Sequence, residues 1–195
     1  EMEQGASTKT AQINAYEFTQ YFETFLSEGK DVLHICLSSG ITGVLNAAQM
    51  AKNELEDKYP DRSIYLVDSL AASAGSGLLV EKLADLRDEG MDIEQLWQWV
   101  QENKLRVNHW FFSSDLKYYI RGGRISKTAG IAGTMLGICP LLDVDVKGRL
   151  ISREKIRGTK RAIAALNDKM CLLADNGQNY NESCFIAHSG CAELA

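Results

Sequence analysis

The chain has 195 residues, of which 45% are hydrophobic, and its formal net charge at pH 7 is −5. This length and composition predict a globular protein with one sizeable hydrophobic core or two small ones. The interspersed charges of both signs argue against nucleic acid or an anionic membrane as a partner, and no apolar run is long enough to cross a bilayer, so we expect no stable membrane insertion.

The first part of the chain alternates helical and strand-like patterns. Asn14 with Glu17, and Asp92 with Gln95, form capping-box pairs that each predict the start of a helix. The expected elements are a helix ending at Gly29, a strand at 32–37, a helix running toward residue 59, a strand at 64–67, a helix at 72–89, a helix after Asp92 and a strand at 107–112. Because strands alternate with helices, we expect a mainly parallel sheet and interpret residues 1–112 as an N-terminal α/β lobe.

The pattern changes at residue 113, and we interpret residues 113–195 as a second α/β lobe. The expected elements are a short helix, a glycine turn, a helix near 129–136, a β-hairpin with strands at 141–146 and 150–156, a helix at 159–173 and a strand at 184–187. The fold class predicted for the whole chain is therefore α/β with two lobes, the second containing a hairpin.

Two predicted strands end in small polar residues that are candidates for a binding site. Residues 38–43, with Ser39 and Thr42, lie where a strand leads into a helix, and free helix amides favour an anion there. The alternative is an ordinary capped turn, and neither a P-loop nor a dinucleotide motif is present. Asp68 and Ser69 end the next strand, where Asp68 either caps the following helix, which we favour, or orients a neighbouring hydroxyl.

A glycine pair between two arginines is a second candidate anion site. Gly122 and Gly123 allow the backbone to turn and to approach a ligand closely, and Arg121 and Arg124 supply forked donors suited to a carboxylate or phosphate. The alternative is an ordinary surface turn, because Gly-Gly pairs and exposed arginines are both common.

Among the three histidines, His188 is the best candidate for a binding site because it follows the last predicted strand. His34 and His109 lie within strands, and we interpret both as structural. A Ser/His/Asp hydrolase built from Ser39 or Ser69 with His188 is disfavoured, since the strained G-x-S-x-G turn that such enzymes use is missing.

The five cysteines are scattered and form no C-x-x-C pair. We expect them to be buried, reduced thiols, which predicts a cytoplasmic protein. The histidine and cysteine spacings do not resemble those of a metal site, so no metal is expected.

Five segments, in this order and spacing, resemble the DegV family of bacterial fatty-acid-binding proteins. They are SSGITG at 38–43, VDS at 67–69, YIRGGRIS at 119–126, GICPLL at 137–142 and KIRG at 155–158. Residues 7–12 resemble the family's Pro-x-Thr-Ser-Gln segment, and residues 186–190 resemble its late histidine strand.

The resemblance implies a carrier that encloses one long-chain fatty acid in an apolar tunnel between two lobes. Such a carrier is not an enzyme and needs no cofactor. It presents the acyl carboxylate to a fatty acid kinase, its expected partner, for conversion to an acyl phosphate used in phospholipid synthesis. Residues 129–140 are our candidate for the tunnel wall, with ordinary core as the alternative.

The resemblance also assigns residues to the head-group site. Thr10, Thr42 and His188 are the expected carboxylate ligands, with Ser39 and Gly43 beside them. Ala11 and Val44 stand where the family usually has hydroxyl residues. The residues expected around the head group, or facing the kinase, are Arg121, Gly122, Gly123, Arg124, Asp68 and Ser69.

Family members usually begin with a strand and a Thr-Asp-Ser motif that precede the Thr10 region, whereas this sequence starts at Glu1 and stops at Ala195. We expect unpaired sheet edges, and hence lower stability or an oligomer that covers them. Two alternative functions remain: a phosphoryl-transfer enzyme on a related α/β scaffold, and a lipid-dependent regulatory or interaction protein.

Overall fold

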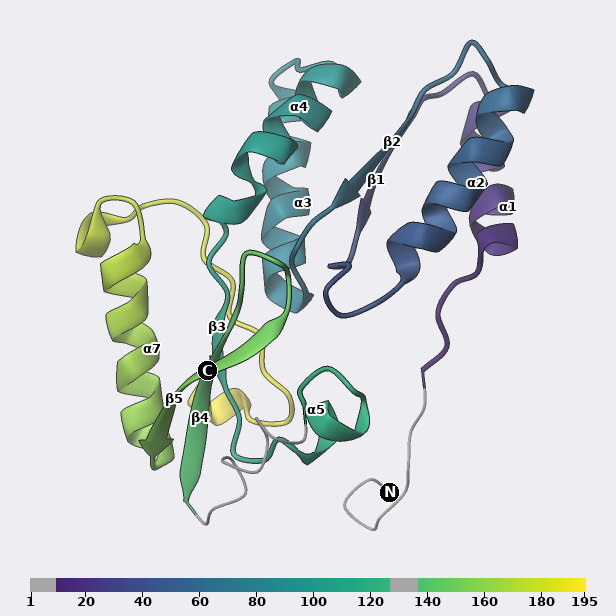
Figure 1. Cartoon of the computed structure of the whole chain (residues 1–195). Helices are drawn as coiled ribbons and strands as arrows, with labels where there is room; N and C mark the ends of the chain where they lie inside the picture. The colour runs from purple at the N-terminus through teal and green to yellow at the C-terminus, as the bar shows by residue number, and fades with distance from the viewer. Residues whose placement is uncertain (1–9, 127–136) are drawn as a thin grey trace.

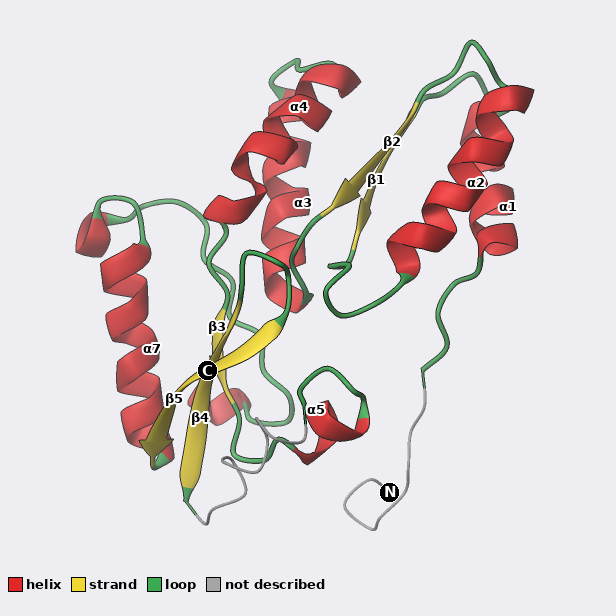
Figure 2. Cartoon of the chain, in the orientation of Figure 1, coloured by secondary structure: helices red, strands yellow, loops and turns green. Residues whose placement is uncertain are grey.

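The computed structural model describes residues 10–126 and 137–195, which form a mixed α/β fold with two sheets (Figure 1). Strands β1 (Val32–Cys36) and β2 (Ile64–Asp68) pair in parallel. Strands β3 (Trp110–Phe112), β4 (Ile138–Val144) and β5 (Leu150–Arg157) form an antiparallel sheet in the order β3-β4-β5. The α/β prediction and the hairpin prediction are both confirmed (Figure 2).

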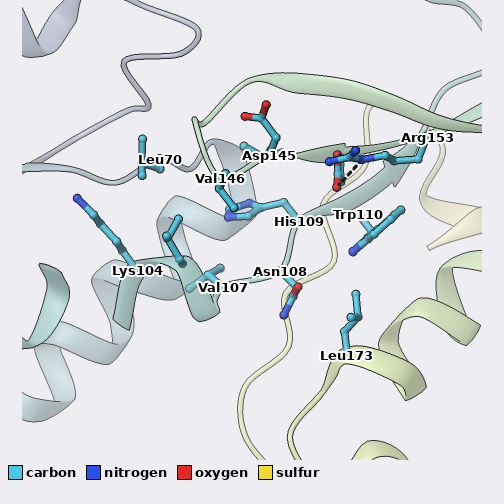
Figure 3. Close-up of a pocket in the computed structure, with 13 residues that line it drawn as sticks. Leu70, Lys104, Val107, Asn108, His109, Trp110, Asp145, Val146, Arg153 and Leu173 are labelled. Carbon is cyan, nitrogen blue, oxygen red and sulfur yellow. Dashed lines mark hydrogen bonds and ion pairs between the residues drawn. The ribbon is translucent and has the colours of Figure 1, made fainter. Parts of the chain in front are cut away.

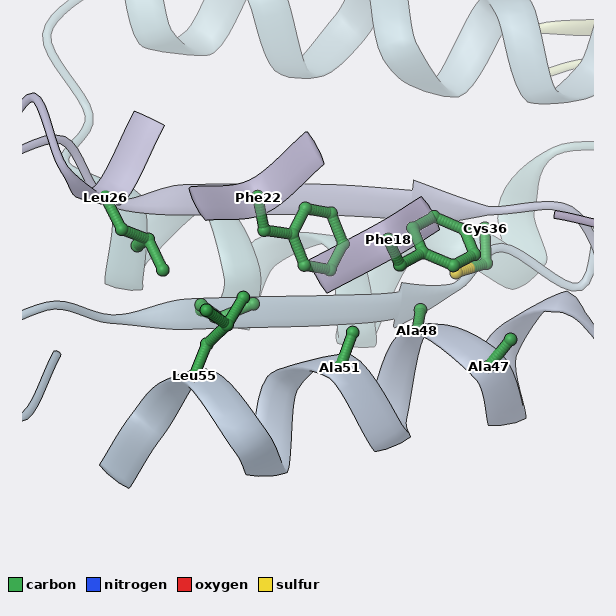
Figure 4. Close-up of a cluster of buried hydrophobic side chains, with 9 residues drawn as sticks. Phe18, Phe22, Leu26, Cys36, Ala47, Ala48, Ala51 and Leu55 are labelled. Carbon is green, nitrogen blue, oxygen red and sulfur yellow. The ribbon is translucent and has the colours of Figure 1, made fainter. Parts of the chain in front are cut away.

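One side of the parallel sheet is covered by helices α1 (Ala15–Leu26) and α2 (Val44–Lys58). Apolar residues at helical spacing on α1 and alanines on α2 meet in a closed core (Figure 4). Phe22 is fully buried there, and the ring of His34 lies edge-on to those of Phe18 and Phe22, 5.2 Å from each. The prediction that His34 is structural is therefore confirmed.

Helices α3 (Ser73–Asp88) and α4 (Ile93–Asn103) cover the other side of the parallel sheet. Their buried leucines pack with Val67 and Val100 in a second core cluster. The capping boxes predicted at Asn14 and at Asp92 are both present, with all four hydrogen bonds between 2.9 and 3.0 Å. A 3-10 turn, η1 (Lys104–Arg106), follows α4.

The antiparallel sheet packs against helix α7 (Thr159–Leu173), which has the predicted bounds. The short helix α5 (Lys117–Arg121) leads into the glycine turn, and Leu116, Ile125 and Leu142 form a small core beside it. The 3-10 turns η2 (Gly177–Asn179) and η3 (Ala192–Leu194) lie in the C-terminal segment. The helix expected near 129–136 lies outside the described residues.

One strand prediction is confirmed only in part, and another was wrong. The strand expected at 107–112 is shorter and pairs antiparallel with β4, with Phe111 opposite Leu142, because apolar alternation marks a strand without specifying its partner. The segment 184–187 is irregular and exposed; Phe185 packs against α3, where a Cβ on Gly77 would lie 3.3 Å from its ring. The lobe boundary at residue 113 stays a prediction.

All five cysteines are free thiols, but they are not all buried. Cys36 and Cys139 are buried, and burial, with Asp68 nearby, raises the pKa of the Cys36 thiol to about 11. Cys184 is exposed, which corrects the expectation of uniformly buried thiols: it lies on the irregular segment, which leaves it at the surface.

Candidate functional site

The parallel strands β1 and β2 end side by side, and this brings Ser39 and Asp68 together. Asp68 accepts a hydrogen bond from the Ser39 amide at 3.1 Å and another from the Ser39 hydroxyl. It also accepts from the amide of Leu70, while α3 starts after Ala72 without a side-chain cap. Asp68 therefore orients a neighbouring hydroxyl, and the helix-capping role that we favoured is wrong, because the intervening turn moves the helix start away from it.

Ser38, which precedes this pair, joins the two sheets. Its hydroxyl is fully buried; it donates to the carbonyl oxygen of Gly148 at 2.7 Å and accepts from the amide of Gly40 at 3.0 Å. Gly148 lies in the β4–β5 turn at φ +68°, where a Cβ would stand 1.8 Å from the Ser38 hydroxyl oxygen. A Cβ on Gly40 would stand 2.5 Å from the carbonyl oxygens of Lys147 and Gly148. The main chain of the hairpin turn thus packs directly against the main chain of the 38–40 loop.

Thr42 and Gly43, further along this loop, adjoin the segment that contains Thr10. The Thr42 hydroxyl lies 3.5 Å from the side-chain oxygen of Gln12, which would also be 3.1 Å from a Cβ on Gly43. Thr10 is two positions before Gln12, and two residues of extended chain span at most about 7 Å, so Thr10 is kept close to the 38–43 loop. Thr10 itself is exposed.

The arginine-glycine loop directly follows the short helix α5. Gly123 has φ +73°, as expected for a glycine turn, and the Arg124 guanidinium donates through Nη1 to the carbonyl oxygen of Gly122. Arg121 lies with its guanidinium 6.0 Å from the centre of the Tyr118 ring. The two predicted arginines therefore point to different surroundings.

Arg124 and Gly40 line one pocket of about 280 Å3, which we call the arginine pocket. A second arginine, Arg149, lines it as well. Arg149 was not among the predicted site residues, although the Asp145-x-x-Gly148-Arg149 pattern is typical of a tight hairpin turn.

Asp145 fixes the orientation of Arg149. One carboxylate oxygen accepts from the backbone amides of Lys147 and Arg149 at 2.9 Å, and the other accepts from the guanidinium Nε and Nη2 at 3.0 and 2.7 Å. The hydrogen bonds from Arg149 are the main cause that lowers the pKa of Asp145, so the carboxylate stays charged near neutral pH.

A second pocket, of about 230 Å3, lies on the other side of the hairpin and is lined by His109 and Lys104 (Figure 3). The His109 imidazole lies directly over Gly75 of α3, where a Cβ would be 1.8 Å from it. Burial lowers the pKa of His109, with Asp143 opposing, and burial also lowers the pKa of Lys104. Lys104 Nζ donates to the backbone carbonyl of Asp68 at 2.9 Å, so it supports the end of β2.

Ser69 and His188 make no side-chain hydrogen bond to the other predicted site residues that the structure describes. Ser69 is fully buried, and its hydroxyl is used within its own turn, where it accepts from the amide of Ala71 at 3.1 Å. His188 is exposed on the irregular C-terminal segment and forms no hydrogen bond with any described residue. The tunnel wall expected at 129–140 falls mainly on residues that the structure does not describe.

Within residues 10–126 and 137–195, no cluster of three or more His, Cys, Asp or Glu side chains could hold a metal ion. In the same residues, none of the helices is both long and apolar enough to cross a membrane.

The model of the DegV family of uncharacterised proteins matches residues 1–195. The chain belongs to the DegV family. A DegV domain-containing protein of Clostridium perfringens is 37% identical over 195 residues, which are 100% of this chain and 66% of the relative. This DegV chain therefore spans slightly less than two thirds of that relative's length.

Two solved structures are similar to this DegV chain. The DegV lipid-binding protein of Thermotoga maritima has a TM-score of 0.75 and 30% identity, over 89% of this chain and 58% of that one. The fatty acid kinase (Fak) B3 protein of Streptococcus pneumoniae, loaded with linoleic acid, has a TM-score of 0.77 and 28% identity, over 85% of this chain and 58% of that one.

Proposed function

We propose that this DegV protein binds one long-chain fatty acid and presents its carboxylate to a fatty acid kinase for acyl-phosphate formation. The observation that carries the proposal is the match of the family over residues 1–195, with structural relatives that bind lipid or are loaded with linoleic acid. On this proposal the protein is a carrier subunit and the kinase supplies the chemistry.

The proposed carboxylate ligands are Thr10, Thr42 and His188, with Ser39 and Gly43 beside them. A carboxylate that leaves water needs several donors, because an unpaired charge is costly to desolvate. The Gln12 contact with Thr42 supports this grouping, since it keeps Thr10 close to the 38–43 loop. The Asp68 contact with Ser39 supports a fixed loop conformation at the same place.

The acyl chain needs only apolar volume. Burial contributes roughly 0.8 kcal/mol per methylene, so a sixteen-carbon chain gains on the order of 10 kcal/mol before ordering costs. Retention during purification therefore requires no covalent attachment. We propose residues 129–140 as part of the tunnel wall and the loop at Arg121, Gly122, Gly123 and Arg124 as the edge that meets the kinase.

Native mass spectrometry of the gently purified protein tests the proposal. We expect a mass increment equal to one long-chain fatty acid, which organic extraction removes. An empty protein that hydrolyses nucleotide would instead favour the alternative, a phosphoryl-transfer enzyme.

A matched pair of variants tests the assigned hydroxyl. Thr42→Val keeps the side-chain shape and removes the donor, so we expect it to retain at least tenfold less fatty acid, in line with the loss of a charge-assisted hydrogen bond. Thr24→Val, on the exposed face of α1, loses a hydroxyl that bonds only the Tyr21 carbonyl and should retain normal amounts. His188→Gln is expected to behave like Thr42→Val; equal retention by all three variants and the unmodified protein would refute the assigned carboxylate ligands.

A further inference from the structure

The arginine pocket contains a side chain that the proposed head-group site does not use. We propose that Arg149, together with Arg124, binds an oxyanion in this pocket, either a carboxylate or the phosphoryl group of an acyl phosphate. For the identity of the anion the inference rests on the proposed function; for the pocket itself it rests on the geometry of the hairpin.

Arg149 is held in place before any ligand arrives. Asp145 engages its Nε and Nη2 and has its other oxygen occupied by two backbone amides, so the carboxylate sets the plane of the guanidinium. Nη1 of Arg149 makes no hydrogen bond with any described residue. A pre-oriented guanidinium loses little conformational freedom when it binds an oxyanion.

Arg124 brings a second guanidinium to the same pocket from a different element. Its Nη1 is used by the Gly122 carbonyl, while its Nε and Nη2 have no hydrogen-bond partner among the described residues. The Ser152 hydroxyl, on β5, also lines the pocket without such a partner. Two arginines and a serine thus line one volume of about 280 Å3.

The remaining lining matches an anion attached to an alkyl chain. Leu150 and Ile151 supply apolar surface, and Gly40 supplies bare backbone from the 38–43 loop. No acidic residue is among the described residues that line the pocket, and Asp145, which pairs with Arg149, does not line it. Excess positive charge beside an apolar wall favours an amphiphilic anion over a free cation or a neutral ligand.

Arg153 of β5, the strand that follows Arg149, provides a matched control. It pairs with Asp143 through its Nε at 2.9 and 3.0 Å, as Arg149 pairs with Asp145, but it lines the other pocket. Loss of either arginine removes one partly exposed ion pair from the hairpin. A difference between the two variants therefore reports on the arginine pocket and not on hairpin stability.

The test has two arms, both performed on the whole protein at low ionic strength, where charge interactions are least screened. In the first arm, inorganic phosphate is titrated calorimetrically into the delipidated protein. We expect Arg149→Gln to weaken phosphate binding about tenfold, Arg149→Lys to weaken it less because charge survives without the fork, and Arg153→Gln to leave it unchanged. In the second arm, native mass spectrometry measures fatty acid retained by the same variants.

The two arms identify the anion and separate this inference from the proposed function. Reduced retention by Arg149→Gln assigns the pocket to the carboxylate itself, whereas weakened phosphate binding with normal retention assigns it to a phosphoryl group. If the protein never retains fatty acid but binds phosphate in a way that depends on Arg149, anion binding in the arginine pocket is supported and the carrier function is refuted. If Arg149→Gln and Arg153→Gln have the same phosphate affinity and retain the same amount of fatty acid, anion binding by the arginine pocket is refuted, even if fatty acid is retained.

Discussion

The two sheets of this protein differ in how completely helices and core side chains cover them. The parallel sheet has helices on both faces, and each face closes a core with fully buried side chains such as Phe22 and Val100. Among the described residues, the antiparallel sheet has α7 beside it and a smaller core cluster of Leu116, Ile125 and Leu142, with Leu141 and Ala162 also fully buried, and much of the segment that follows α7 is exposed. The comparison indicates that the first sheet supplies most of the stability and that the candidate site lies where the second sheet docks onto it.

Truncating the first core is expected to have the largest effect. Phe22→Ala removes a ring that is 0% exposed and should lower the free energy of unfolding by about 3–5 kcal/mol, because a cavity is left between α1 and α2. Urea denaturation measures the change. Tyr21→Ala is the control, since its neighbouring ring is 56% exposed; a similar loss for both would contradict the assignment of the core to this face.

The contact between the sheets is expected to come next. Gly148→Ala should cost about 2–4 kcal/mol, from the left-handed φ of +68° and from the clash with the Ser38 hydroxyl. Gly29→Ala has a similar φ of +76° with open space around it, so it measures the backbone penalty alone. If the two variants have the same melting temperature, the hairpin turn does not press on the 38–40 loop.

Two half-buried histidines predict a dependence of stability on pH. Burial lowers the pKa of His34 and of His109 below the value of about 6.5 typical of an exposed imidazole, and only for His109 does a carboxylate, Asp143, oppose the shift. Below about pH 6.5 the unfolded chain takes up protons that the folded protein excludes, so stability falls as pH falls.

Two variants assign that pH dependence to a region. His34→Gln should flatten the fall in stability between about pH 6.5 and 5 more than His109→Gln, because its imidazole has no opposing carboxylate. Denaturation curves at a series of pH values measure this. If His109→Gln has the larger effect, the pH dependence comes mainly from desolvation of His109, beside the antiparallel sheet.

The smallest effect is expected at the C-terminal segment. Lys82 of α3 pairs with Glu182 at 2.9 Å, but the two side chains are 44% and 58% exposed. Lys82→Gln should therefore change the unfolding free energy by less than about 1 kcal/mol. Limited proteolysis provides the second measurement: unchanged cleavage after residue 174 is expected, since Phe185 still packs against Gly77.

Local signals in the sequence predicted the elements well where the cause was local. The capping boxes at Asn14 and Asp92 and the turn at Gly148 depend on residues a few positions apart, and all three are present. The segment before His188 was misassigned as a strand because a short apolar run forms a strand only when a neighbouring strand is available to pair with it. The sheet to which β3 belongs is likewise a long-range property.

The candidate site was only partly predictable for the same reason. Ser39 and Asp68 were placed correctly at one sheet edge, because parallel strands end together. The role of Asp68 depended on where α3 begins, which its sequence did not specify. Arg149 was missed because it reaches the arginine pocket only when the hairpin turn docks between Gly40 and Leu70, a contact between residues far apart in the chain.

The close approach of Gly40 and Gly148 also limits which second mutations can compensate for a substitution at Gly40. The atoms that an added Cβ at Gly40 would strike are main-chain carbonyl oxygens, which have no rotamers and are present whatever side chain stands there. A screen for second-site suppressors of Gly40→Ala should therefore recover no compensating side-chain change at residues 147 or 148. Suppressors are expected only as insertions or deletions that alter the length of the hairpin turn.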